Sequence, residues 1–326
     1  MKKFAFIALI LFLLIPAFAW YIVTTPVCIK SAQESFEASN EDSLRAHVEF
    51  LCNTPEFRNF RNLESLNLAA EYIFNVFSQY ADSVYYQEFE VAGTTYRNVV
   101  ATIEAGTEPC MVIGAHYDVC NNQAGADDNA SGVAGLLELC RILSENRESL
   151  KRTYELVAFT LEEPPYFRTS DMGSAHHARY CRRNKIEMEL MVCLEMIGYF
   201  TDDENSQAYP QDGLELIYPS VGNYIALVGE IGHESYIRRI KSLMKASSDL
   251  PVESISAPAS MPGIDFSDHL NYWSQDYRAI MVTNTSFYRN RNYHEPTDTP
   301  ETLDFQRMNK VVNGVAYALI HYDDRE

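Results

Sequence analysis

Apolar residues follow two patterns along this chain, short continuous runs and stripes at helical spacing. Runs such as Met111-Val112-Ile113 and residues 154–161 are typical of strands buried on both faces of a mostly parallel sheet. Residues 133–143, which lie between those runs, repeat their apolar side chains at the spacing of a helix. Because strands and helices alternate in this way from residue 41 onward, the pattern predicts one α/β domain.

The same periodicities give an expected order of elements. Helices are predicted over residues 41–52, 62–80, 133–143, 171–183, 234–245 and 303–322, with a short helix beginning at Ser267-Asp268-His269. Buried strands are predicted over residues 110–113, 154–161, 190–197, 224–228 and 278–283. Residues 83–90 and 95–103 are rich in Val, Tyr and Thr, which indicates an antiparallel hairpin. Residues 254–266 are expected to be irregular.

The first 23 residues have the pattern of a targeting segment. Met1-Lys2-Lys3 provides a positive start, an almost unbroken apolar stretch follows, and Ala17-Phe18-Ala19 offers a cleavage site. The apolar stretch is also close to the ~20 residues that a spanning helix needs. Residues 1–23 are therefore a signal peptide or an N-terminal membrane anchor, followed by a linker over 24–40 and one folded domain over 41–326. Either alternative predicts export to a periplasmic or extracellular location, with membrane contact only through residues 1–23.

Charge and cysteine content restrict the possible partners. The formal net charge of −19 excludes a nucleic-acid partner in our interpretation, because little in the chain would neutralise phosphates. The 7 cysteines are odd in number and form no CxxC pair, so neither a dense disulfide framework nor a cysteine-based zinc site is predicted.

Histidine and carboxylate side chains follow several of the predicted strands. Carboxyl ends of parallel strands meet at one edge of an open sheet, and that edge is where such sheets bind ligands. Histidine and carboxylate together are typical zinc ligands. The side chains placed there are His116, Asp127 or Asp128, Glu162, Glu163, Glu195 and His294. Asp118 lies two positions after His116, on the same face of an extended strand, and is predicted to hold the other nitrogen of that imidazole.

Glu195 is the most informative of these residues taken singly. It ends an apolar strand, where a buried carboxylate without a partner would be costly. A metal ion would remove that cost. The adjacent Glu162 and Glu163 suit a division of labour, since neighbouring side chains on an extended segment point in different directions and only one need bind the metal.

Seven short motifs together resemble one enzyme family. GAHYD, GADDNASG, LEE, GSxxxA, LEMIG, SDH and YHEPTDT occur in the order and spacing of the M28 family of zinc aminopeptidases, a family that also includes the glutaminyl cyclases. The resemblance covers residues 110–305. It implies a three-layer α/β/α sandwich around a mixed, mostly parallel sheet of about eight strands.

The resemblance also implies a role for each motif residue. In such a site His116 and Glu195 bind one Zn²⁺, Glu163 and His294 bind a second, and Asp127 bridges the two ions. Asp127 would be joined to Asp128 by a cis peptide bond, and Glu162 would be the general base that accepts a proton from water. Two Zn²⁺ ions per chain are expected.

The sequence departs from the family pattern at two positions. Glu195 stands where the family often has Asp, which keeps the charge and adds one methylene group. Ile264 stands where some members have a tyrosine that stabilises the oxyanion, so that help would come from the metal or from another group such as Tyr288. Asp265 is a candidate for holding a substrate amine. His269 is expected to cap a helix or to contact substrate.

Three functions remain open from the sequence. The first is a dizinc aminopeptidase acting on peptides with a free N-terminus. The second is a glutaminyl cyclase, which uses one zinc on the same scaffold. The third is a non-catalytic, receptor-like domain, which is disfavoured because every predicted ligand position carries a residue able to bind a metal.

Overall fold

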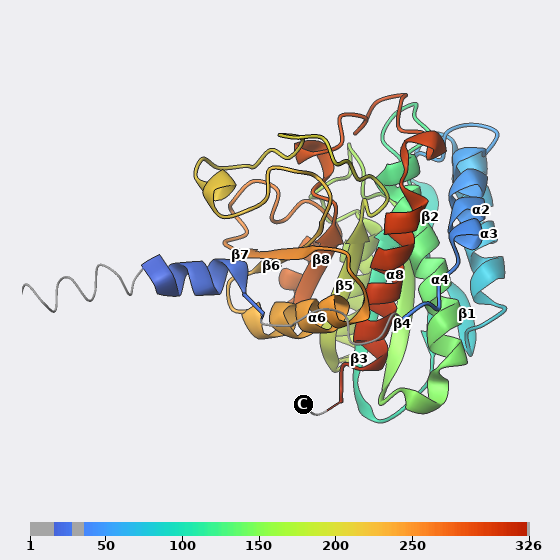
Figure 1. Cartoon of the computed structure of the whole chain (residues 1–326). Coiled ribbons are helices and arrows are strands. Elements are labelled where there is room, and N and C mark those ends of the chain that lie inside the picture. The colour runs from blue at the N-terminus through green and yellow to red at the C-terminus, as the bar shows by residue number, and fades with distance from the viewer. Residues whose placement is uncertain (1–15, 28–35, 325–326) are drawn as a thin grey trace, which may run out of the picture.

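The computed structural model describes residues 16–27 and 36–324 (Figure 1). Most of the predicted targeting segment, residues 1–15, and part of the predicted linker, residues 28–35, lie outside the described residues. Residues 16–24 are helical. Within the two described ranges, no helix combines the length and the apolar character that a membrane crossing requires.

One mixed sheet of 8 strands forms the centre of the domain, in the order β1-β2-β4-β3-β5-β8-β6-β7. Strands β3, β4, β5 and β8 are parallel neighbours, and the hairpin β1–β2 joins β4 in antiparallel register. On the other side β6 is antiparallel to β8 and parallel to β7. The strands are β1 Ser83–Val91, β2 Thr94–Ile103, β3 Glu108–His116, β4 Arg152–Phe159, β5 Met188–Glu195, β6 Ile225–Glu230, β7 Val252–Ala257 and β8 Ala279–Thr283.

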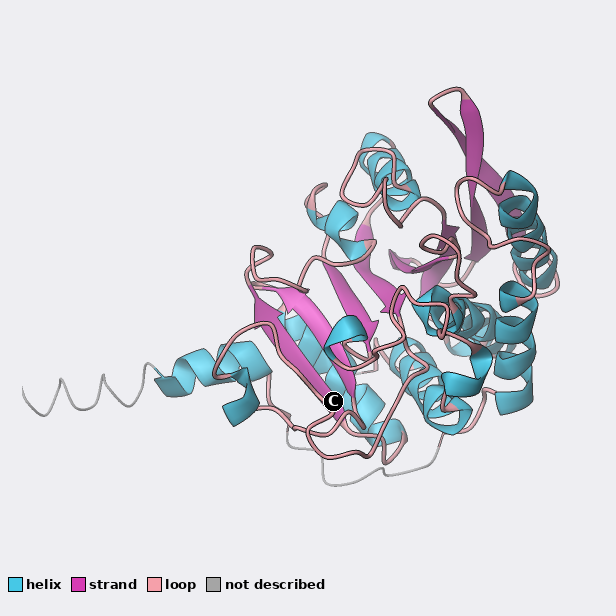
Figure 2. Ribbon diagram, turned by 90° about the horizontal axis from the view of Figure 1, so that it is seen from above, coloured by secondary structure: helices cyan, strands magenta, loops and turns pink. Residues whose placement is uncertain are grey.

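Helices cover both faces of this sheet, as Figure 2 shows from above. The larger apolar core joins the sheet to α2 Glu41–Cys52, α3 Leu63–Phe77, α4 Gly132–Glu145, α6 Glu234–Ser247 and α8 Phe305–Ile320. The smaller core lies under α5 Gly173–Arg183 and α7 His269–Trp273. Successive side chains of β3 point to opposite faces of the sheet, so Ile113 packs into the larger core and Val112 into the smaller one. The predicted three-layer α/β/α architecture is confirmed.

Residues 254–266 were predicted to be irregular, and this prediction is wrong for residues 254–257, because β7 covers Val252–Ala257. Its inward positions include Ser254 and Ser256, so the stretch lacks the apolar alternation that identifies a strand. Hydrogen bonds take the place of apolar packing there. Ser254 Oγ donates to the carbonyl of Thr24 at 2.7 Å, and Ser256 Oγ donates to the carbonyl of Glu230 at 3.2 Å.

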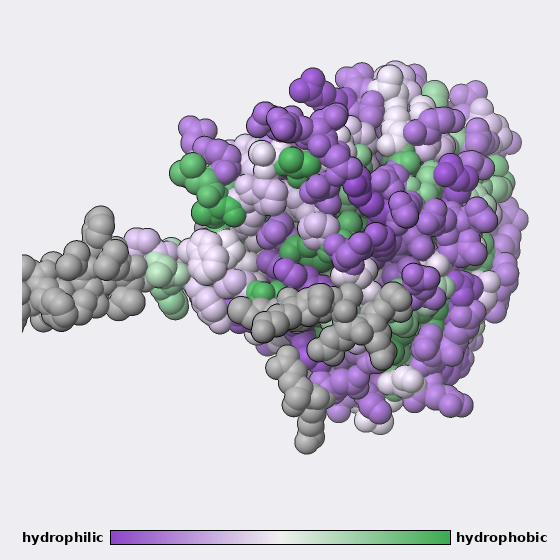
Figure 3. All heavy atoms as spheres, viewed as in Figure 1, coloured by the Kyte–Doolittle hydropathy of each residue, from purple (hydrophilic) through white to green (hydrophobic). Residues whose placement is uncertain are grey.

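The described part of the predicted linker is packed against the domain. The amide oxygen of Asn313 on α8 accepts hydrogen bonds from the backbone N–H groups of Ala38 and Ser39, both at 2.8 Å. The ring of Phe36 packs edge-on against that of Tyr317, with centroids 5.5 Å apart. The face of the domain visible in Figure 3 is mostly hydrophilic, with separate hydrophobic patches.

Candidate metal centre

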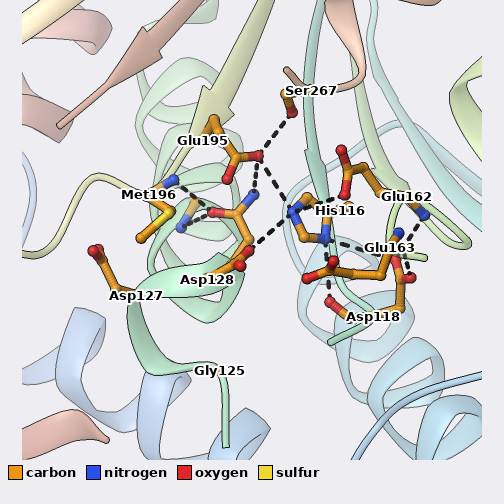
Figure 4. A network of polar contacts seen from close by, with 12 residues as sticks. His116, Asp118, Gly125, Asp127, Asp128, Glu162, Glu163, Glu195, Met196 and Ser267 are labelled. Atoms are coloured by element: carbon orange, nitrogen blue, oxygen red, sulfur yellow. Dashed lines mark hydrogen bonds and ion pairs between the residues drawn. The ribbon is translucent and has the colours of Figure 1, made fainter. Parts of the chain in front are cut away.

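The histidine and carboxylate side chains meet at the carboxyl edge of the sheet (Figure 4). His116 and Glu195 are the last residues of β3 and β5, and Glu162 and Glu163 follow β4. Asp128 lies in the turn Ala126–Ser131 that precedes α4. The long loop after β8 adds His294, which is distant in sequence from the other residues.

Asp128 lies between the two histidines. The Nε2 atom of His116 is 3.4 Å from Asp128 Oδ1, and the Nε2 atom of His294 is 3.2 Å from Asp128 Oδ2. We call His116, Asp128 and Glu195 the first pole, in which Glu195 Oε2 is 3.3 Å from His116 Nε2. We call His294, Asp128 and Glu163 the second pole, in which Glu163 Oε2 is 3.2 Å from His294 Nε2.

These separations fit donors arranged around cations. Nitrogen and oxygen ligands lie about 2.0–2.2 Å from zinc, and a tetrahedral arrangement therefore places two ligands about 3.3 Å apart. Direct N–H···O hydrogen bonds are shorter, at about 2.9–3.0 Å. Among the described residues, His116 Nε2, Asp128 Oδ2, Glu163 Oε1 and His294 Nε2 are buried atoms that have no hydrogen-bond partner. The residues present therefore fit bound metal ions, and His116, Asp128 and Glu163 each offer a ligand atom within 4.8 Å of the others.

Asp118 fixes three of the neighbouring groups. His116 Nδ1 donates to the backbone carbonyl of Asp118 at 3.1 Å, which leaves Nε2 directed at Asp128 and Glu195. The Asp118 carboxylate accepts the backbone N–H groups of Glu162 at 3.2 Å and Glu163 at 3.1 Å. The predicted contact of Asp118 with His116 is present, but the backbone carbonyl makes it, whereas the carboxylate holds the backbone N–H groups of Glu162 and Glu163.

The end of β5 is held by polar side chains that the sequence did not single out. Ser267 Oγ donates to Glu195 Oε2 at 2.7 Å. Asn129 donates its amide N–H to the carbonyl of Leu194 at 2.9 Å and accepts the backbone N–H of Met196 at 3.0 Å. Met196 has φ +50°, a left-handed conformation that costs a residue with a side chain on the order of 1–3 kcal/mol and is found mainly at functional sites.

The predicted bridging position of Asp127 is corrected by the structure. Asp127 Oδ1 accepts the backbone N–H groups of Gly198 at 2.9 Å and Tyr199 at 3.1 Å. Its Oδ2 accepts the side-chain amides of Asn284 and Asn290, both at 2.8 Å. In Figure 4 the Asp127 side chain points away from His116, whereas Asp128 points toward it.

The predicted cis peptide bond is displaced in the same way. It joins Asp128 to Asn129 and not Asp127 to Asp128. The whole assignment is thus shifted by one residue along the chain, and Asp128 takes the place between the two poles.

Three further predicted residues lie outside both poles. Asp265 forms a partly exposed ion pair with Arg168, so its carboxylate already has a cationic partner. His269 donates its Nε2–H to the carbonyl of Ile264 at 2.7 Å and is fully buried, and burial lowers its pKa to about 4. This local hydrogen bond is one of the two roles that the sequence left open for His269. Tyr288 lines a neighbouring cavity rather than the space between the histidines.

Two residues near the centre were missed as functional candidates. Asp298 accepts the backbone N–H groups of Asp127 at 2.9 Å and Asp128 at 3.1 Å through its two carboxylate oxygens. The ring of Tyr293 stacks on that of His294, with centroids 3.7 Å apart and an interplanar angle of 17°. Both lie in the YHEPTDT motif, so the signal was present, but the partners of Asp298 are far away in sequence.

The site carries an excess of negative charge. Burial raises the pKa of Glu162 well above its usual value, and the carboxylates of Glu163 and Glu195 add to this rise. Burial opposes protonation of His116, but Glu162 and Glu195 outweigh it and raise the pKa of His116 well above its usual value. Bound divalent cations would be the largest charges in such a site and would oppose both changes.

Two adjoining cavities open beside the carboxylates. The polar one is lined by Asp128, Glu162, Glu163, Glu195 and His294 together with Phe167 and Tyr293. The other is lined mostly by apolar and aromatic groups, including Tyr209, Tyr224, Met281 and Tyr288. Glu195, Phe266, Ser286 and Phe287 border both cavities.

Residues 98–319 match the sequence model of peptidase family M28. The protein belongs to this family. The M28 match includes every residue of the two poles, and it makes the chain a metallopeptidase with peptide substrates.

This M28 peptidase is similar to other proteins over two thirds or more of its length. The "Uncharacterized protein YfbL" of Escherichia coli (strain K12) is 43% identical over 325 residues, which cover 97% of this chain and 98% of that protein. Leucine aminopeptidase 1 of Ajellomyces dermatitidis is 28% identical over 242 residues, covering 69% of this chain and 57% of that protein. The glutaminyl cyclase of Bacteroides thetaiotaomicron has the same fold, with a TM-score of 0.65, 14% identity, and coverage of 89% of this chain and 99% of that one.

Proposed function

We propose that this M28 peptidase is an exported dizinc aminopeptidase that removes N-terminal residues from peptides. The observation that carries the proposal is the position of Asp128, whose two carboxylate oxygens each face one histidine, His116 at 3.4 Å and His294 at 3.2 Å. His116 and Glu195 would hold one Zn²⁺, Glu163 and His294 the other, and Asp128 both. Export rests on the positively charged start and apolar stretch of residues 1–23.

Two zinc ions held in this way supply Lewis-acid polarisation of a carbonyl group and lower the pKa of water. Glu162 is the group left free to move protons. It lines the polar cavity, its Oε2 atom is 3.8 Å from His116 Nε2, and its backbone N–H is fixed by Asp118. Glu162 would accept the proton of the water that attacks the scissile carbonyl and deliver it to the departing amine.

The adjoining apolar cavity supports a preference for an apolar N-terminal side chain. It begins at Glu195, Phe266 and Phe287, so a residue whose carbonyl lies in the polar cavity can place its side chain there. The wall contains Ala226, Val228, Ile264 and Met281, and fully burying a leucine-sized side chain is worth about 1.5–3 kcal/mol. The similarity to a protein named leucine aminopeptidase supports the same preference.

The proposal is tested by assaying the purified full chain against aminoacyl-nitroanilides and against peptides that begin with glutamine. We expect hydrolysis of leucyl and other apolar substrates, two Zn²⁺ ions per chain, and loss of activity in the presence of a chelator. The Glu162→Gln variant should keep both ions and lose about 10²–10⁴-fold in rate, because the general base is removed.

A different result would identify the alternative function. One Zn²⁺ per chain, with release of ammonia from glutamine peptides and no hydrolysis of aminoacyl-nitroanilides, would make the protein a glutaminyl cyclase. The shared fold with the Bacteroides cyclase is the observation that keeps this alternative in view. Full hydrolytic activity of Glu162→Gln would refute the role given to that residue.

A further inference from the structure

Cys120 lies next to the second pole, and nothing in the proposed mechanism uses it. It is the fourth residue after His116 and is only 5% exposed. Its sulfur, a carboxylate oxygen of Glu163 and a ring nitrogen of His294 all lie within 4.8 Å of one another. This limit admits ligands of a single ion, since Zn–S bonds are about 2.3 Å and Zn–N bonds about 2.0–2.1 Å long.

We propose that Cys120 is a thiolate ligand of the metal ion at the second pole. Sulfur would then join Glu163 and His294, the two side chains that offer ligand atoms within 4.8 Å of it. The proposal rests on metal binding at this pole, which is part of the proposed function, but it does not depend on which reaction the enzyme catalyses.

The neighbouring atoms are consistent with a ligand role. In the described part of the chain, Asp128 Oδ2, Glu163 Oε1 and His294 Nε2 are all buried and lack hydrogen-bond partners. Asn121 donates its side-chain N–H to Cys120 Sγ at 3.2 Å, so the sulfur acts as an acceptor toward its neighbour.

The loop that carries Cys120 is held in place on both sides. Val119 donates its backbone N–H to the carbonyl of Arg58 at 3.1 Å. The fully buried Arg58 side chain donates to the carbonyls of Tyr117 at 2.9 Å and Gly125 at 2.7 Å. Because Arg58 holds the loop before and after Cys120, the sulfur has a fixed position, which a metal ligand requires.

A thiolate at the second pole would make the two metal sites unequal. The first pole offers three protein side chains, the number that catalytic zinc sites use. The second pole would add a sulfur ligand, which would favour soft ions such as Cd²⁺ and Zn²⁺. Binding of each ion there converts the thiol to a thiolate and releases one proton to the solvent.

The test uses the metal-free full chain titrated with Co²⁺, whose thiolate complexes show a sulfur-to-metal charge-transfer absorption. Cys120→Ser is compared with the control Cys181→Ser, because Cys181 belongs to a separate Glu155–His177–Cys181 group away from this edge of the sheet. We expect the absorption in the wild type and in Cys181→Ser and its loss in Cys120→Ser. We also expect Cys120→Ser to bind Cd²⁺ about tenfold or more weakly.

Three results would overturn the proposal. Two bound Co²⁺ ions without the absorption in the wild type would exclude a thiolate ligand and leave the metal centre standing. Absorption that persists in Cys120→Ser and disappears in Cys181→Ser would assign the sulfur to the other group. Failure of the wild type to bind Co²⁺ or Zn²⁺ at all would remove the metal centre and the proposed function together. Cadmium-113 NMR of the wild type reads the same ligand without any substitution, in case the serine variant does not fold.

Discussion

Two carboxylates outside the poles hold the ligands by the same device. Asp118 accepts the consecutive backbone N–H groups of Glu162 and Glu163, and Asp298 accepts those of Asp127 and Asp128. In each pair one side chain enters a pole and its neighbour does not. A carboxylate that accepts hydrogen bonds from two successive backbone N–H groups fixes the direction of both side chains. Hydrogen bonds to an ionised group are stronger than those between neutral groups.

The two adjacent aspartates give a sharp prediction at the residue scale. Asp128→Ala should lose metal at both poles, because each histidine faces one oxygen of that carboxylate. Asp127→Asn should keep the metal and lower the free energy of unfolding by about 1–3 kcal/mol, since the amide cannot accept from all four of its present donors. Metal content after dialysis and urea unfolding of both variants provide the measurement. Metal loss in Asp127→Asn with full retention in Asp128→Ala would restore the assignment made from the sequence.

The choice between Asp127 and Asp128 could not be made from the sequence. Both residues lie in a short turn with no helical or strand period, so nothing local tells which side chain points toward His116. The groups that turn Asp127 away, Asn284, Asn290 and the backbone N–H of Gly198, come from the ends of other strands. The motif resemblance identified Asp127 and Asp128 together. Only the positions of Asn284, Asn290 and Gly198 in the folded chain show which aspartate faces the histidines.

At the scale of elements, strand order explains why the site assembles. β4, β3, β5 and β8 are consecutive parallel neighbours, so residues at or just after their carboxyl ends lie side by side. That convergence could be predicted, because these strands are continuous apolar runs. Strand β7 could not be predicted, because its inward-facing serines form hydrogen bonds with partners distant in sequence, such as Thr24.

The contact between α5 and β4 gives a prediction of pH dependence. His177 on α5 is fully buried, with Nε2 3.5 Å from Glu155 Oε1 on β4 and Nδ1 2.7 Å from the hydroxyl of Tyr272 on α7. Burial would lower the pKa of His177, but Glu155, with Cys181 one turn along α5, outweighs it and raises the pKa to about 10. The protonated histidine therefore stabilises the folded state fully at pH values below 6.5, the ordinary pKa of histidine. This stabilisation is lost as the pH rises toward 10.

Replacing His177 should remove that dependence. We expect the free energy of unfolding of the wild type to fall between pH 6.5 and pH 10, and that of His177→Gln to be lower by about 3 kcal/mol near pH 6.5 and flatter above it. Denaturant unfolding of both proteins at several pH values measures the difference. Parallel curves for wild type and variant would show that the ion pair does not titrate in this range.

At the scale of the whole molecule, both the net charge of the chain and the carboxylates of the site produce electrostatic repulsion in the folded state. The chain carries a formal net charge of −19, and Asp128, Glu162, Glu163 and Glu195 line one cavity. Self-repulsion of this kind opposes the compact state. Cations bound at the poles would offset the repulsion among the carboxylates that lie closest together. Metal binding should therefore add to the free energy of unfolding as well as support catalysis.

Metal removal should therefore lower the thermal stability of the entire domain. Ligands that bind only the folded state stabilise it by about 4 kcal/mol at a thousandfold excess over Kd, which corresponds to a Tm increase on the order of 10 °C for a domain of this size. We expect a chelator to lower Tm by such an amount and Zn²⁺, but not Mg²⁺, to restore it, because imidazole ligands suit zinc and disfavour magnesium. Asp128→Ala should show no response to Zn²⁺, whereas Glu162→Gln should respond as the wild type does, since Glu162 lies outside both poles. An equal response of Asp128→Ala and the wild type would mean that the stabilising zinc binds elsewhere.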